Sequence, residues 1–241
     1  MSLLFPQLPD GPVADFDPEL LEATVEELIA VLEEQDGGRR LAAAALLAAH
    51  GNDAGREILR EGVEEDASTY VALEALRWLE DDHCLPWARD VLGRRLLSPF
   101  VQAQAAALLI AVGEGADRER GTAHLLERAR NRTRDDDRGL VVELLGEVGV
   151  EAALEELEKT AAAVADPFCG AALKALARLD PEGVRERLSA LARDGAADTD
   201  LRCDAVEALS ILDDEAARAV LLEVAGGDDI VADLAQGLVE D

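Results

Sequence analysis

Aromatic residues, cysteines and long apolar stretches are all scarce in this chain of 241 residues. Phe, Trp and Tyr make up 3% of it, and no apolar run reaches the ~18 residues that a membrane-spanning helix needs. Cys84, Cys169 and Cys203 lie far apart without a Cys-x-x-Cys pair, which argues against a disulfide framework or a zinc ribbon. We expect buried thiols. The apolar content of 49% is too high for a disordered chain, so the sequence predicts a folded protein.

Positive charge is scarce as well. The chain has 23 Lys and Arg residues against 52 Asp and Glu residues, which gives a net charge of -29. This charge opposes the approach to nucleic acids and to anionic membranes, because both carry dense negative charge. We therefore expect neither a nucleic acid nor a membrane as the partner.

The types of charged residue suggest that the protein works at high salt concentration. Only Lys159 and Lys174 are lysines, and the other basic residues are arginines, a combination that resembles proteins of salt-accumulating haloarchaea. Carboxylates keep a protein hydrated when concentrated salt screens charges to within about 3 Å. The alternative is an acidic surface that binds a basic partner. The N-terminal residues lack a basic region and contain prolines 6, 9 and 12, so we expect no targeting signal and a cytoplasmic protein.

A short phrase recurs along the chain: a small or apolar residue, Leu, two further residues, an apolar residue, and then Gly or an acid. The leucines that anchor the phrase are 29, 33, 36, 31, 33 and 29 residues apart, which indicates a repeat with loops of variable length. They are Leu47, Leu76, Leu109, Leu145, Leu176, Leu209 and Leu238. Alanine precedes five of these seven leucines by four residues, one helical turn away on the same face. Each phrase therefore predicts an amphipathic helix, and the alanines predict that neighbouring helices approach closely.

A second apolar set follows most anchors after about twelve to fifteen residues, so each repeat is expected to be a pair of helices. Five prolines fall where a helix should begin, and an aspartate that can cap the helix precedes three of them. These are Pro18, Pro86, Pro99, Pro167 and Pro181, with Asp17, Asp166 and Asp180. The predicted fold is all-α: an α-solenoid (superhelix) of about six to seven helical hairpins.

The ends of the chain complete the predicted organisation. Residues 1–18 are expected to form an N-terminal arm, and residues 19–241 a single solenoid domain. Within the domain, residues 19–36 are predicted to form one amphipathic helix that caps the first repeat, and residues 230–238 to form the closing helix.

The repeats resemble the HEAT-repeat family, and especially its short-repeat group named after phycobilisome lyases. The phrases that carry the resemblance are RLAAAALLAAHGND, YVALEALRWLED, RGLVVELLGEVG, GAALKALARLD and RCDAVEALSILDD, and it extends from about Arg39 to the C-terminus. The Asp-x-x-Val-Arg element of the family survives in part, in Asp200-Leu201-Arg202 and Asp137-Arg138. Thr69, Gln102, Cys169 and Val231 occupy the arginine position elsewhere.

The resemblance implies a HEAT fold and leaves two functions open, protein binding and a lyase-like activity. Some short-repeat HEAT enzymes hold a di-iron centre with His-Glu dipeptides. Here His50, His83 and His124 are followed by Gly, Cys and Leu, so we expect no metal, no cofactor and no catalytic residue.

Two further groups of residues could carry chemistry or could be purely structural. His83-Cys84 places a base beside a nucleophile, but neighbouring side chains on a helix diverge, so we interpret the pair as part of a loop. Asp135 to Asp137 offer oxygen ligands for a cation, but consecutive side chains point in different directions. We expect the triplet to cap a helix and to pair with arginines. The common nucleotide-binding and hydrolase motifs are absent.

One segment departs from the general acidity. Residues 118–134 contain six arginines and two glutamates, a local charge of +4. The structural interpretation is that these arginines offset a helix dipole and pair with the Asp triplet. The functional one is a docking surface for an acidic partner, because guanidinium groups bind carboxylates in a bidentate manner. The predicted partner-binding residues are Arg118, Arg120, Arg130, Arg132 and Arg134.

From these observations we expect a non-catalytic HEAT-repeat scaffold or adaptor that mediates protein–protein interaction in a high-salt cytoplasm. The alternative is a lyase-like enzyme or enzyme subunit of the short-repeat HEAT group.

Overall fold

The protein is built of α-helices, as the computed structural model shows for residues 18–34, 37–64, 69–94, 97–131 and 137–240. No β-strand occurs among these residues, which confirms the all-α prediction. The chain divides into two compact units, Met1–His124 (unit 1) and Leu125–Asp241 (unit 2), and the boundary falls within the helix α8 (Ala116–Arg130). The predicted N-terminal arm lies outside the described residues except for Pro18.

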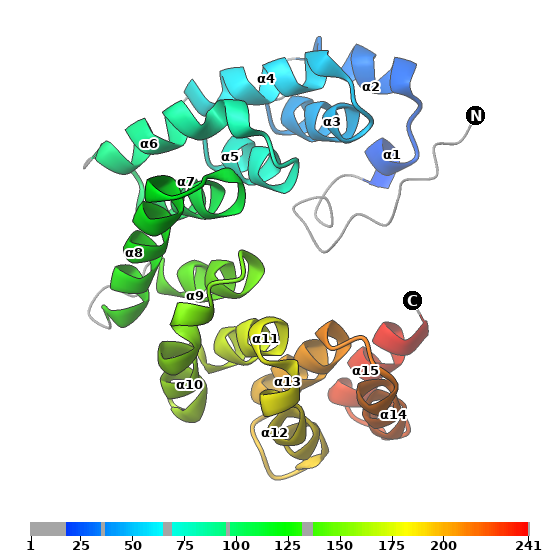
Figure 1. Ribbon diagram of the computed structural model, residues 1–241. Helices are drawn as coiled ribbons and strands as arrows, with labels where there is room; N and C mark the ends of the chain where they lie inside the picture. The colour runs from blue at the N-terminus through cyan, green and yellow to red at the C-terminus, as the bar shows by residue number, and fades with distance from the viewer. Residues whose placement is uncertain (1–17, 35–36, 65–68, 95–96, 132–136, 241) are drawn as a thin grey trace. The chain divides into compact units, whose positions relative to one another are not determined.

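In unit 1, the first helices of successive repeats lie side by side, α3 next to α5 and α5 next to α7 (Figure 1). The second helices pack against them, α4 against α3 and α5, and α6 against α7. The helices of this unit are α1 (Pro18–Leu21), α2 (Val25–Val31), α3 (Gly37–Ala49), α4 (Asp53–Glu64), α5 (Thr69–Trp78), α6 (Leu85–Gly93) and α7 (Pro99–Val112), with the 3-10 turn η2 (Asp82–Cys84) before α6.

Unit 2 repeats the arrangement. Its first helices form the row α9, α11, α13 and α15, while α10, α12 and α14 form the second layer (Figure 1). The helices are α9 (Arg138–Glu147), α10 (Leu154–Ala162), α11 (Cys169–Leu179), α12 (Pro181–Arg193), α13 (Thr199–Ile211), α14 (Glu215–Val224) and α15 (Ile230–Glu240), with the 3-10 turn η3 (Glu151–Ala153) before α10. In the described parts of the chain, the pairs from α3/α4 to α13/α14 make six hairpins, which confirms the predicted helical repeat.

The recurring phrase forms the core of each unit. Six of the seven anchor leucines are completely buried, and Leu238 of α15 is partly buried. The small residues one turn earlier are equally buried, among them Ala72, Ala105 and Ala172. These small residues therefore belong to the buried face of their helices, as the recurring phrase predicts.

The last position of the phrase, Gly or an acid, follows the end of each first helix from α3 to α13. Gly51, Glu80, Gly149 and Asp213 all have positive φ, between 44° and 77°. Around three of these positions the backbone forms the hydrogen bonds of a Schellman motif, such as the 3.0 Å bond from Asp81 N to Leu76 O. The sequence period thus marks both the buried face of the helix and the turn that follows it.

Two local predictions are wrong. Residues 19–36 do not form one helix, because Thr24 starts a new one: its hydroxyl accepts from Glu27 N at 3.3 Å, and Glu27 accepts from Thr24 N at 2.8 Å. Asp166 does not cap α11, which begins at Cys169 after Pro167. Its carboxylate binds Arg138 and the amide of Phe168 instead.

Candidate functional site

The predicted partner-binding arginines divide into three groups. Arg118 is exposed on α8, and its Nη1 donates a 3.0 Å hydrogen bond to the carbonyl of Ile110. Arg120 is also exposed and forms no hydrogen bond or ion pair with a described residue. The pKa of Asp117 is lowered first by the hydrogen bond from Arg89, and the charge of Arg120 contributes to a smaller extent.

Arg130 lies at the other end of α8, within unit 2, and is exposed like Arg120. Its charge helps lower the pKa of Glu155, after the larger effect of the hydrogen bond from Lys159, but it makes no close pair in the described structure. Arg132 and Arg134 lie outside the described residues, as do Asp135 and Asp136. The remaining arginine of the segment is Arg128.

Arg128 has a structural role. Its Nε and Nη2 both lie 2.5 Å from the carboxylate of Asp137, which is 2% exposed and immediately precedes α9. The side chain of Asp137 does not bond to the helix amides, so the expected N-cap is replaced by this ion pair. The expectation that the Asp triplet pairs with arginine thus holds for its described member.

Arg138 is a buried arginine that joins three elements of unit 2, and the sequence predicted no binding or structural role for it. Arg138 at the start of α9 is 2% exposed, and its Nη2 lies 2.8 Å from Asp166 Oδ2 and 3.2 Å from Thr160 Oγ1. Its Nε donates to the carbonyl of Ala129 at the end of α8, and its guanidinium stacks 5.2 Å from the ring of Phe168. Arg138 therefore satisfies a helix C-terminus and holds the loop before α11.

Arg202 makes two of these contacts, to an aspartate and to a helix-end carbonyl, in a later repeat. It lies at the start of α13, its Nη1 is 2.6 Å from Asp229 of the loop before α15, and its Nε donates to Ala192 O near the end of α12. The sequence contained a signal for this role. Arg138 and Arg202 occupy the arginine position of the family element, and each precedes its aspartate by about one repeat, 28 and 27 residues.

Ion pairs between repeats also engage the second helices. Examples are Arg89 with Asp117 at 2.8 Å, Arg185 with Asp214 at 2.6 Å and Arg193 with Glu223 at 2.6 Å. Most described Lys and Arg side chains therefore form hydrogen bonds or ion pairs within the protein. Within the described residues, the arginines without a hydrogen bond or ion pair are Arg120, Arg130 and Arg178.

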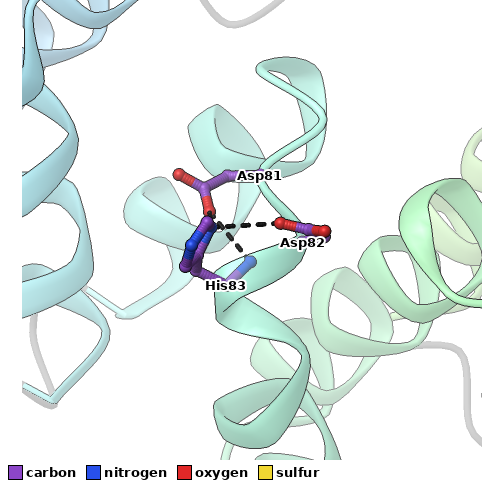
Figure 2. A group of neighbouring side chains, drawn as sticks. All are labelled: Asp81, Asp82 and His83. Carbon is purple, nitrogen blue, oxygen red and sulfur yellow. Dashed lines mark hydrogen bonds and ion pairs between the residues drawn. The ribbon is translucent and has the colours of Figure 1, made fainter.

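A second polar cluster lies where α5 meets η2. Asp81, Asp82 and His83 bring potential metal ligands within 4.8 Å of one another, beside an open depression of ≈ 400 Å³ (Figure 2). His83 Nδ1 lies 3.0 Å from Asp82 Oδ1, and both side chains are largely exposed. Asp81 is 1% exposed at its side chain and accepts from the amide of His83.

The surroundings of Asp81 do not fit a cation. Arg60 donates to both of its carboxylate oxygens, at 3.0 and 2.7 Å, and Arg56 donates to one of them at 3.2 Å. Burial alone would raise the pKa of Asp81, but the hydrogen bonds from Arg60 and Arg56 lower it below its usual value. Two guanidinium groups would repel a metal ion at this position. We interpret the cluster as a clamp between α4 and the turn after α5.

His83 and Cys84 occupy different environments despite their adjacency. The side chain of His83 is 73% exposed, whereas Cys84 is completely buried. Burial raises the pKa of the Cys84 thiol to about 12, so the thiol stays protonated at neutral pH. The two residues lie in the 3-10 turn η2 rather than in an irregular loop.

The stacked hairpins and the ion pairs between repeats define a helical-repeat protein. No family model matches the sequence, and no curated protein matches it. Among solved structures, the chain is similar to the complex of CpcE and CpcF of phycocyanin lyase from Nostoc sp. PCC7120. The match covers 98% of this chain and 99% of that chain, with a TM-score of 0.53 and 20% sequence identity. At this identity, the similarity shows the fold. In the described residues, no helix is long and apolar enough to span a bilayer.

Proposed function

We propose that this chain is a non-catalytic helical-repeat scaffold that binds another protein through contacts that include exposed arginines of α8. The observation that carries the proposal is that Arg120 and Arg130 are exposed and form no hydrogen bond or ion pair with a described residue, whereas most other described cations do. In a chain with 52 acidic residues and 23 basic ones, an exposed guanidinium without a carboxylate partner is unexpected. Both residues are exposed and unpaired within the described structure, although carboxylates are abundant.

The chemistry of the contact follows from the guanidinium group. It offers a planar fork of donors that binds a carboxylate in a bidentate manner, and such short-range bonds persist when salt screens long-range attraction. The partner would therefore present acidic side chains to α8. Arg118, Arg132 and Arg134 belong to the same predicted contact.

Two observations support protein binding in general. Stacked helical repeats expose long surfaces to a partner. The similar solved structure is itself a complex of two proteins. A second candidate function, a lyase-like enzyme subunit, is favoured by the extent of that similarity, which covers nearly the whole of both chains.

Affinity capture from the source cell at its native salt, followed by mass spectrometry, tests the proposal. A scaffold is expected to retain a reproducible protein partner whose mass does not change on incubation with the chain. A covalent change of the partner that requires the chain would favour the lyase-like function. The absence of any partner at stoichiometric amounts would contradict both.

A further inference from the structure

A second surface, in unit 2, carries the opposite charge. It lies on α9, α11 and α13, the row of first helices in which α11 packs between α9 and α13 (Figure 1). Each helix contributes two charged side chains three or four residues apart, which places them on one face. We call this the charged face of unit 2, and it consists of Glu143, Glu147, Lys174, Arg178, Asp204 and Glu207. Four carboxylates face two cations, so its formal charge is -2.

The ammonium group of Lys174 is committed to α13. Its Nζ lies 2.9 Å from Glu207 Oε2 and 3.2 Å from Asp204 Oδ1. The residue opposite Asp204 on α11 is Gly170, where an added Cβ would come within 1.7 Å of Asp204 Oδ2. The absence of a side chain there allows the Asp204 carboxylate to lie against α11, within reach of Lys174.

In this arrangement, no described residue donates a hydrogen bond to Glu143. The side chain is half-buried and forms no hydrogen bond with a described residue, because the lysine on the adjacent helix donates to Asp204 and Glu207. Burial raises the pKa of Glu143, and the charges of Lys174 and Arg178 only partly oppose that effect. Burial weakens the hydration of the Glu143 carboxylate, and a cationic donor from a partner would stabilise its ionised form.

We propose that the charged face of unit 2 binds an arginine- or lysine-bearing segment of a partner protein, and that Glu143 accepts a hydrogen bond from its cation. The excess of carboxylates on this face selects a cationic segment and repels phosphate backbones. A side-chain cation fits better than a bare metal ion. Glu143 lies near the charges of Lys174 and Arg178, and a guanidinium group can form directed hydrogen bonds to its carboxylate. This contact goes beyond the proposed function, in which the α8 arginines meet acidic groups.

The test uses the full chain and two synthetic helical peptides of equal length, one with arginine at every fourth position and one with glutamate at the same positions. Fluorescence anisotropy measures their binding at about 0.15 M KCl, where charges further apart than ~8 Å are screened. We expect the arginine peptide to bind and the glutamate peptide not to bind. Glu143→Gln should weaken the arginine peptide about tenfold, as the loss of one charged hydrogen bond predicts.

The matched control is Glu186→Gln. Glu186 is an exposed carboxylate on α12, in the other layer of the same unit, and forms no hydrogen bond or ion pair with a described residue. Its replacement should leave the peptide affinity nearly unchanged. If both substitutions weaken binding equally, the peptide is attracted only by the overall acidity of the chain, and the proposal is wrong.

A second measurement needs no substitution. The carboxyl carbon of Glu143, followed by NMR during a pH titration, should show a pKa that falls when the arginine peptide is added, because a bound cation stabilises the ionised form. A pKa that does not change on binding would overturn the proposal. Replacing Arg120 and Arg130 should leave the peptide affinity intact, so failure of the α8 contact is distinguishable from failure of this one.

Discussion

Arg138 and Asp166 form a buried ion pair across one repeat of unit 2, with Nη2 and Oδ2 2.8 Å apart. Arg202 and Asp229 form the equivalent pair at 2.6 Å, and the arginine of each pair also donates to a carbonyl at the end of the preceding second helix. Both pairs link successive repeats of unit 2, whereas Arg120 and Arg130 of α8 form no ion pair with a described residue.

Replacing Arg138 with alanine should strongly destabilise the fold. The substitution removes the guanidinium donors of the Asp166 carboxylate and of the Ala129 carbonyl, in a site where Arg138 is 2% exposed. Breaking a buried pair costs about 3–5 kcal/mol. Chemical denaturation followed by circular dichroism measures the change. Arg94→Ala is the control, because Arg94 and Asp90 form an exposed pair whose loss should cost about 1 kcal/mol or less. Equal losses in the two variants would contradict the assigned role of Arg138.

The sequence predicted what is periodic and missed what depends on contacts between repeats. The anchor leucines and the alanines one turn before them are buried as expected, because a helical stripe repeated along the chain has one way to bury its face. The break at Thr24 was missed because an apolar stripe continues through it, while the capping box is local.

The candidate site depended even more on tertiary structure. Arg118, Arg120, Arg128 and Arg130 are alike in the sequence. Only the positions of Ile110 and Asp137 distinguish Arg118 and Arg128, which are hydrogen-bonded, from the two arginines that form no hydrogen bond with a described residue. The charged face of unit 2 lies on helices that are separate in the sequence, so no local motif could reveal that no described residue donates a hydrogen bond to Glu143.

The stability contributed by Asp81 should depend on pH. Its pKa is lower in the folded protein than in the unfolded chain, so its contribution is fully present above the unfolded pKa of about 3.9 and is lost as the pH falls through the folded pKa. Asp81→Asn should therefore destabilise the protein most at neutral pH. Denaturation at a series of pH values measures the difference between the two proteins. A difference that grows as the pH falls below ~4 would show that the sign is wrong.

The close approach of α9 and α11 should be sensitive to a single methyl group. A Cβ added at Gly146 would lie 2.6 Å from Ala175 Cα, so Gly146→Ala must push the two helices apart, at about 1–3 kcal/mol. Gly237→Ala is the matched control on α15, where nothing lies within 4 Å of the added Cβ. There the substitution should stabilise the helix by about 0.5–1 kcal/mol. Thermal melts should show a lower melting temperature for Gly146→Ala and a higher one for Gly237→Ala. A higher melting temperature for Gly146→Ala would contradict the tight packing of α9 and α11.

The net charge of -29 predicts that the melting temperature rises with salt. The carboxylates outnumber their cationic partners, and salt screens the repulsion among exposed groups. Melts from low to multimolar KCl measure the effect. An unchanged or falling midpoint would contradict the interpretation of the acidity as an adaptation to salt.

The most direct test of the scaffold proposal compares capture of the partner by three forms of the chain: wild type, the double variant Arg120→Gln/Arg130→Gln, and the control Arg94→Gln. Arg94 is also an exposed arginine of the described chain, but it is paired with Asp90 and lies outside α8. Quantitative mass spectrometry of the captured protein at native salt should show at least about a tenfold loss for the double variant alone, with its melting temperature unchanged. Equal capture by all three forms would contradict the proposed role of α8.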